Sequence, residues 1–235
     1  SLRWYKNMIG NCSADVVSST VPCSNKWMIG TVNSFFIGFI ATFIATTLGT
    51  LAALGLSRPH MPYKGLIMAI LISPMIVPLI ITAAGMFFFY ARINLVYSFT
   101  GIILAHVALA TPFVVITVTA TLVGFDMNMV KASQSLGARP VRTFFKVIMP
   151  LILPGVISGA LFAFITSFDE VVIVMFMASL DQLTIPKQMW AGIRQEISPV
   201  ILCMATCLVV LSILLLTTVE LLRRRSEKLR GITSR

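Results

Sequence analysis

The side chains that could carry out chemistry are few in this sequence and widely scattered. It holds four cysteines, two histidines and eight acidic residues. His60 and His106 lie in different segments, and no His or carboxylate stands at ligand spacing from a pair of cysteines, so no metal site is indicated. The sequence also lacks a phosphate-binding glycine loop, a nucleophile elbow and a His-Glu-x-x-His motif. We therefore predict that the chain is not an enzyme and binds no metal or cofactor itself.

The four cysteines occur as two pairs in the sequence, and the two pairs lie in segments of different character. Cys12 and Cys23 share a polar segment, and an oxidising compartment would permit a disulfide there, although two free thiols remain an alternative. Cys203 and Cys207 lie one helical turn apart in an apolar stretch, as is typical of cysteines that pack as small hydrophobic residues. Of the histidines, we expect one in a solvated loop, at residue 60, and one at a hydrogen-bonded helix interface, at residue 106.

The composition indicates which kind of fold must position these residues. Hydrophobic residues make up 57% of the chain, charged residues 11%, and the mean hydropathy is +0.95. One water-soluble globule cannot bury so much apolar surface. Uncharged stretches long enough to cross a bilayer of about 30 Å occur at 27–57, 65–91, 93–125, 147–168 and 197–219. We predict an all-α, polytopic membrane protein with five spanning helices, because an isolated strand would leave backbone groups unpaired in lipid.

The ends and kinks of these helices give further expectations. The chain starts at Ser1 without an initiator Met, so we expect a sixth spanning helix before it. Pro74, Pro78 and Pro112 each remove a backbone hydrogen bond inside an apolar stretch and favour a kink. Aromatic residues at 87–90 and 97 predict a belt at one membrane interface.

The distribution of Lys and Arg predicts the orientation. Short basic loops stay in the cytoplasm, and the C-terminal residues 223–235 are strongly basic. Alternating spans then divide the chain into a periplasmic segment 1–26, a transmembrane domain 27–222 with a cytoplasmic loop 124–153, and a cytoplasmic tail 223–235. The net charge of +10 follows from this topology and from anionic lipid, so nucleic-acid binding is not indicated. We expect a multi-pass membrane protein whose C-terminus is cytoplasmic.

The cytoplasmic loop carries the most informative pattern. Asp126 can cap a short helix, Gly137 suits the left-handed position just past its end, and Pro140 suits the first position of a second helix. Apolar residues continue at helical spacing through residues 141–149, until Pro150 and Pro154 bracket the start of the next apolar stretch. On residue types alone, an ordinary amphipathic connector would explain the loop equally well.

The same residues resemble the cytoplasmic signature of binding-protein-dependent importer permeases of the ATP-binding cassette class. Lys131-Ala132-Ser133 stands where that family has Glu-Ala-Ala, Gly137 stands for its glycine, and Val147-Ile148-Met149-Pro150 stands for its closing Ile-x-Leu-Pro. The likeness continues through residues 151–175. There, Pro154 to Phe164 followed by Ser167-Phe168-Asp169-Glu170 is similar to permeases of spermidine and putrescine importers.

The resemblance implies a type I importer fold in which the first short helix is a coupling helix, docked in a groove of an ATP-hydrolysing subunit. It assigns this coupling role to Asp126, Lys131, Ala132, Ser133, Leu136, Gly137, Ala138, Arg139 and Pro150. Small residues at 132 and 133 would permit close approach. Lys131 departs from the family's Glu, so either the ATPase has a compensating acid or docking depends on shape, with Arg139 and Arg142 supplying charge.

Asp169 and Glu170 are adjacent acids between two uncharged runs. The resemblance places them, with Phe168, along the substrate path, where a carboxylate and an aromatic ring could stabilise a cationic polyamine. Sequential helical residues point about 100° apart, so one acid at most should face the path. The alternative is a hydrated helix end near the outer interface.

The resemblance also implies partners: a second permease, similar or identical, two ATPase subunits that use ATP and Mg²⁺, and a periplasmic substrate-binding protein. The chain itself would form half of the pathway, and the resemblance places it in a bacterial inner membrane. Other substrates, such as an iron complex, an opine or a phosphonate, remain alternatives within transport, and a membrane enzyme or a channel is the alternative outside it.

Overall fold

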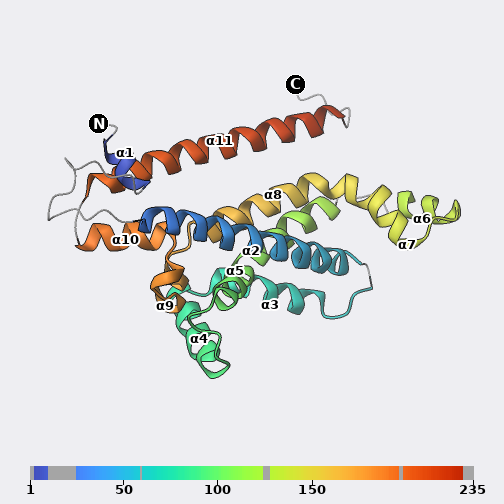
Figure 1. Cartoon of the computed structure of the whole chain (residues 1–235). Coiled ribbons are helices and arrows are strands. Elements are labelled where there is room, and N and C mark those ends of the chain that lie inside the picture. Colours follow the sequence, from blue (N-terminus) through green and yellow to red (C-terminus); the bar gives the residue numbers. More distant parts are fainter. Residues whose placement is uncertain (1–2, 10–24, 59, 124–127, 196–197, 230–235) are drawn as a thin grey trace. The chain divides into compact units, whose positions relative to one another are not determined.

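The computed structural model describes residues 3–9, 25–58, 60–123, 128–195 and 198–229, and within them every regular element is a helix (Figure 1). This confirms the all-α prediction. The elements are α1 (Arg3–Met8), α2 (Lys26–Leu56), α3 (Lys64–Ile76), α4 (Leu79–Arg92), α5 (Phe99–Val123), α6 (Asn128–Ser135), α7 (Pro140–Thr143), the π-helix η1 (Phe144–Ile148), α8 (Met149–Phe168), α9 (Val172–Met177), the 3₁₀-helix η2 (Leu180–Gln182), α10 (Ile185–Gln195) and α11 (Pro199–Leu229).

Three helical stretches among the described residues are long and apolar enough to cross a membrane: Lys26–Leu56, Phe99–Val123 and Pro140–Phe168. A fourth crossing is possible if the bent pair α3 and α4 forms one span. The described apolar part of α11, Pro199–Leu214, is shorter than a span. Five crossings therefore stay a prediction.

The stretch 65–91, expected as one helix, consists of two helices that meet at an angle of 102°. Val77 adopts an extended conformation (φ −70°, ψ 135°), because the ring of Pro78 disfavours the helical conformation in the residue before it. The kink expected at Pro78 is therefore a full break. Pro74 and Pro112, in contrast, lie inside the continuous helices α3 and α5.

The chain divides into two compact units. The first unit comprises residues 1–38, 83–103 and 168–235, and the second comprises residues 39–82 and 104–167. In the first unit the apolar core includes Ile37, Ile102, Ile173, Met177 and Ile185, none of them more than 1% exposed. α9 and α10 therefore pack in the same unit as the N-terminal part of α2.

In the second unit, α5 packs tightly against glycines of α2 and α8. A Cβ added at Gly49 would lie 2.7 Å from the Cβ of Val114, and one added at Gly159 would lie 3.0 Å from the Cα of the same residue. A Cβ at Gly155 would overlap the side chain of Thr121. Close packing through small residues is the usual way in which membrane helices associate without a hydrophobic driving force.

Candidate functional site

The hairpin of α6 and α7, residues 128–143, contains seven of the nine predicted coupling residues, all except Asp126 and Pro150; we call it the α6 hairpin. Gly137 has φ +78°, which confirms the left-handed conformation predicted for it. The N–H of Ala138 donates to the carbonyl of Ser133 (3.1 Å) and that of Gly137 to the carbonyl of Gln134 (2.9 Å). These two bonds form a Schellman motif, which satisfies carbonyls at the end of α6.

The second arm of the hairpin starts as predicted. Arg139 is extended (φ −67°, ψ 153°) and Pro140 occupies the first turn of α7. The hydroxyl groups of Ser133 and Thr143 lie 2.9 Å apart and share a hydrogen bond, and Thr143 is only 2% exposed. The two arms are therefore fastened by a side-chain bond as well as by the turn.

The outer surface of the α6 hairpin is apolar and basic. Leu136 is 89% exposed, Val141 is also exposed, and Ala132, Lys131 and Arg139 face solvent. The structure thus turns Ala132 outward and Ser133 toward α7, although the sequence pattern had paired them as one contact surface. Asp126 lies outside the described residues, so its predicted capping role stays a prediction.

The hairpin continues into α8 without interruption. Residues 144–148 form a π-helix, in which the N–H of Met149 donates to the carbonyl of Phe144, five residues earlier. Pro150 is the second residue of α8, at the predicted start of this apolar helix, whereas Pro154 lies inside the helix. The wider π turn directly precedes Pro150, which has no N–H to donate to the carbonyl of Lys146.

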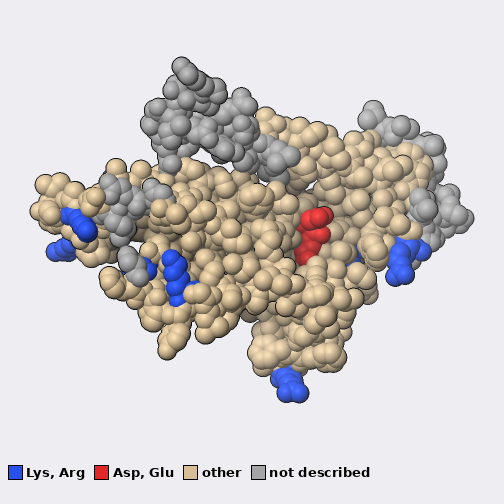
Figure 2. Space-filling model, turned by 180° about the vertical axis from the view of Figure 1, so that it is seen from behind, with Lys and Arg blue, Asp and Glu red and all other residues tan. Residues whose placement is uncertain are grey.

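The two acids after α8 have different environments. Asp169 is exposed, whereas Glu170 is 6% exposed and its Oε1 accepts a hydrogen bond from the N–H of Ile173 (2.8 Å). Glu170 therefore satisfies a donor in the first turn of α9. The Phe168 ring packs on Phe35 with centroids 5.2 Å apart. Figure 2 shows a small patch of acidic atoms on a face made mostly of neutral atoms.

Residues 169–185, which we call the α9 segment, are held by side chains from elsewhere in the first unit. Asn33 of α2 donates from Nδ2 to the carbonyls of Asp181 (2.9 Å) and Leu183 (3.0 Å). The neighbouring Ser34 accepts the N–H of Ile185 at 2.9 Å. We call these hydrogen bonds of Asn33 and Ser34 the clamp, and sequence reasoning missed it. The only signal was a pair of polar residues inside an apolar stretch, because their partners lie about 150 residues away.

Two further contacts hold the α9 segment. Gln182 donates from Nε2 to the carbonyl of Tyr97 (2.7 Å), and the N–H of Tyr97 donates to the carbonyl of Met177 (2.9 Å). Lys187 donates from Nζ to the carbonyls of Val174 and Ala178, each at 3.1 Å. Its cation lies at the C-terminal end of α9, where the helix dipole favours positive charge. Burial lowers the pKa of Lys187 below its ordinary value.

The histidines and cysteines singled out in the sequence can now be compared with their surroundings in the structure. His106 is buried at 1% exposure, and its Nδ1 lies 2.8 Å from Ser167 Oγ, which confirms a hydrogen-bonded helix-interface histidine. His60 is exposed in a turn, as expected. Cys203 and Cys207 are free thiols, the first buried and the second partly buried. Cys12 and Cys23 lie outside the described residues, so their disulfide stays a prediction.

Comparison with known proteins places these features in a family. A family model described as "Binding-protein-dependent transport system inner membrane component" matches residues 45–228. The spermidine/putrescine transport system permease protein PotC of Haemophilus influenzae is 29% identical over 227 residues, which cover 97% of this chain and 83% of the relative. PotC of Escherichia coli K12 is 31% identical over 190 residues, covering 81% and 72%.

Two further matches extend this result. The putrescine transport system permease protein PotI of Escherichia coli K12 is 28% identical over 214 residues, covering 88% of this chain and 71% of the relative. Among solved structures, a chain of the MetNI methionine ABC transporter in an inward-facing conformation matches with a TM-score of 0.61 and 21% identity, covering 87% of this chain and 95% of that chain. At that identity the likeness shows the importer transmembrane fold alone.

These matches confirm the resemblance found in the signature loop and the prediction of a multi-pass inner membrane protein that is a transport permease rather than an enzyme. Because the family model covers most of the chain and PotC exceeds 30% identity over most of its own length, the chain belongs to the inner membrane components of binding-protein-dependent transport systems.

Proposed function

We propose that this chain is the transmembrane permease subunit of an ATP-driven polyamine importer, in which it forms half of the translocation pathway and couples that pathway to ATPase subunits. Family membership supports the transport role, and the names of the relatives support spermidine or putrescine as the substrate. The observation that carries the coupling role is the α6 hairpin. Its backbone and hydroxyl groups are bonded internally, while Leu136 and Val141 are left exposed.

The exposed face of the hairpin is suited to a groove on an ATPase subunit. Ala132 is small enough for close approach, and Leu136 supplies an apolar side chain that contact with another protein would bury. Lys131 and Arg139 are exposed beside them, so the matching surface of the ATPase should be acidic. In this chain a Lys therefore replaces the Glu of the family signature, and the partner supplies the acid.

Asp169 is the better of the two candidate acids for a substrate contact. Its carboxylate is exposed, whereas that of Glu170 is buried and engaged by the N–H of Ile173. A carboxylate next to the aromatic pair Phe168 and Phe35 offers both a charge and a π face to an ammonium group. We therefore assign the substrate path to Asp169 and Phe168, and a local structural role to Glu170.

The complete importer would contain a second permease, two ATPase subunits that use ATP and Mg²⁺, and a periplasmic binding protein that delivers the substrate. Segments 1–26 and 179–198 would face that protein, while the α6 hairpin and the basic tail 223–235 would lie in the cytoplasm. Another small solute, such as an iron complex, an opine or a phosphonate, is the second candidate substrate. The names of the relatives favour polyamines over it.

Uptake by the complete importer in proteoliposomes tests the substrate. With the cognate binding protein outside and ATP inside, labelled spermidine or putrescine should accumulate, and an excess of unlabelled polyamine should abolish the signal. Accumulation of a phosphonate, an opine or an iron complex, with no polyamine uptake, would contradict the substrate assignment but leave the importer assignment intact.

Site-specific photo-cross-linking tests the coupling role separately. A photoreactive residue in place of Leu136 should cross-link to the ATPase subunit in the assembled complex. The same residue at His60, which is exposed but outside the hairpin, serves as the matched control and should cross-link far less. Equal cross-linking from both positions would contradict the proposal that the hairpin contacts the ATPase subunit.

A further inference from the structure

The first unit contains an apolar cavity of about 290 Å³ that the transport role does not use. It lies among the C-terminal end of α1, the first turns of α2, the start of α10 and one face of α11. On α2 the lining extends from Trp27 to Phe35, and on α11 from Met204 to Leu211. Segments that are distant in the sequence therefore line one hydrophobic space, which is partly open to the surroundings.

Water is a poor occupant of this cavity. Its volume has room for several water molecules, and every water needs two or more polar partners. Thr31 is the one lining residue with a hydroxyl group, and that group already donates to the carbonyl of Trp27 at 2.8 Å. The cavity therefore suits a hydrocarbon group.

The dimensions of the cavity match one leaflet of a bilayer. Trp27 and Phe35 are eight residues apart, or about 12 Å along a helix. One leaflet contributes about 15 Å of hydrocarbon, half of a core roughly 30 Å thick. Trp27 lies one residue after the start of the spanning helix α2, and indole rings favour the membrane interface. The cavity thus begins at interface depth and continues through most of a leaflet.

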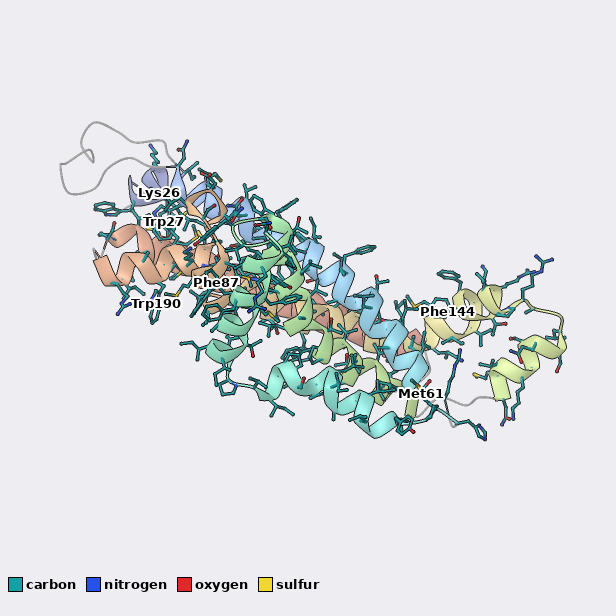
Figure 3. The ribbon with its side chains drawn as sticks, turned by 90° about the horizontal axis from the view of Figure 1, so that it is seen from below. Lys26, Trp27, Met61, Phe87, Phe144 and Trp190 are labelled. Atoms are coloured by element: carbon teal, nitrogen blue, oxygen red, sulfur yellow. The ribbon has the colours of Figure 1, made fainter. Side chains whose placement is uncertain are left out.

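Two lysines lie within two residues of lining residues at the interfacial end of the cavity. Lys6 precedes the lining residue Met8 on α1, and Lys26 precedes Trp27 on α2; both lysines are exposed. Neither α1 nor the first turn of α2 carries an acidic residue of its own. Figure 3 shows Lys26 and Trp27 together at this end of α2. An anionic headgroup would be attracted to this end.

We propose that the cavity binds one acyl chain of an anionic phospholipid, with the headgroup phosphate held by Lys6 and Lys26. Such a lipid would join α1, α2 and α11, which come from distant parts of the sequence. This site does not depend on the transported substrate, so a negative result for lipid binding would leave the polyamine assignment unchanged.

A pair of tryptophan substitutions on α11 tests the site. Leu208→Trp would fill the cavity, whereas Val209→Trp alters a neighbouring residue that is 58% exposed and does not line it. The assembled transporter, extracted from membranes that contain phosphatidylglycerol and phosphatidylethanolamine, is examined by native mass spectrometry. We expect wild type and V209W to retain phosphatidylglycerol in preference, and L208W to retain at least fivefold less. Equal retention by L208W and V209W would overturn the proposal.

Charge and occupancy are tested on the same complex. The double variant K6Q/K26Q should lose the preference for phosphatidylglycerol, while Arg92→Gln, an exposed cation away from the cavity, should keep it. Cys207 lines the cavity, so an apolar maleimide should label it several-fold more slowly in phosphatidylglycerol nanodiscs than in lipid-free micelles. An unchanged labelling rate, or a photo-cross-link from position 208 to a protein segment instead of lipid, would also overturn the proposal.

Discussion

The α6 hairpin and the α9 segment both follow long apolar helices, α5 and α8, yet the side chains of the two segments have opposite environments. In the α9 segment Glu170 and Gln182 are buried and hydrogen-bonded, and Asn33 and Lys187 donate to its carbonyls from other elements. In the α6 hairpin one side-chain bond joins the arms, and the large apolar residue Leu136 is 89% exposed.

The difference indicates where each segment finds its partners. Buried polar groups that are bonded within the chain give a rigid element whose conformation needs no other protein. An internally capped helix that exposes apolar side chains gains stability only when another surface covers them. The α9 segment is therefore organised by this chain, and the α6 hairpin is organised for contact with a second chain. The following substitutions test this contrast.

Gly137→Val should have the largest effect. The residue has φ +78°, which a β-branched side chain adopts only at a cost well above the roughly 1 to 2 kcal/mol of an ordinary residue. A Cβ at this position meets no atom within 4 Å, so the damage would come from the backbone alone. Substrate-stimulated ATP hydrolysis by the assembled complex should fall to the basal rate.

Gly137→Asn is the matched control, because Asn tolerates the left-handed conformation. We expect it to keep most of the stimulation. If the valine variant also kept normal stimulation, the hairpin geometry would not matter for coupling. The inference that the α6 hairpin is organised for contact with a second chain would then be contradicted.

Asn33→Leu should have the second largest effect, and on stability rather than on coupling. It removes both donors that reach the carbonyls of Asp181 and Leu183, and a buried group left unsatisfied costs about 1 to 3 kcal/mol. Thermal unfolding of the solubilised protein should shift downward. Thr47→Val, on the same helix but exposed, should change the free energy of unfolding by about 0.5 kcal/mol at most. Similar shifts for both variants would show that the clamp contributes little.

The two acids sharpen the comparison within the α9 segment itself. Asp169→Asn should raise the polyamine concentration needed for half-maximal uptake roughly tenfold, since a charge-assisted contact is worth about 1 to 3 kcal/mol. Glu170→Ala should instead lower stability by about 1 kcal/mol through loss of the bond to Ile173, and Glu170→Gln should restore most of it. A transport defect in Glu170→Gln with none in Asp169→Asn would reverse the assignment.

The sequence predicted the α6 hairpin closely because its determinants are local. The left-handed turn depends on Gly137 itself and the second helix start on Pro140, and each acts within a few residues. The break at Pro78 has a local cause as well, since a proline restricts the residue before it. The sequence did not indicate which of the three prolines would break a helix, because that depends on the packing of each segment.

The α9 segment could not be predicted in the same way. Its partners Asn33 and Tyr97 lie far away in the sequence. The residues around them do not indicate which groups of the α9 segment they contact. The sequence did suggest that two adjacent acids cannot face the same way, and the structure shows one exposed and one buried. Only the packing of α9 decides that the buried acid is Glu170.

The smallest expected effect concerns Lys187 and pH. Burial lowers the pKa of this lysine from its ordinary 10.5, so the folded protein releases the proton more readily than the unfolded chain does. Between the lowered pKa and 10.5 the unfolded state binds more protons, and the free energy of unfolding therefore rises with pH. The penalty of a partly buried charge is fully present below that window and is relieved within it. Partial exposure and solvent screening keep the effect small.

Two variants separate this titration from the hydrogen bonds of Lys187. Lys187→Gln carries no charge at any pH, and Lys187→Arg stays charged throughout, so neither can titrate in this range. Thermal unfolding between pH 8 and pH 10 should show the wild type gaining stability relative to both variants as the pH rises. Loss of the bonds to Val174 and Ala178 alone would produce an offset that does not change with pH. Parallel pH profiles for the three proteins would mean that Lys187 holds the end of α9 by hydrogen bonding and that its burial has no measurable electrostatic cost.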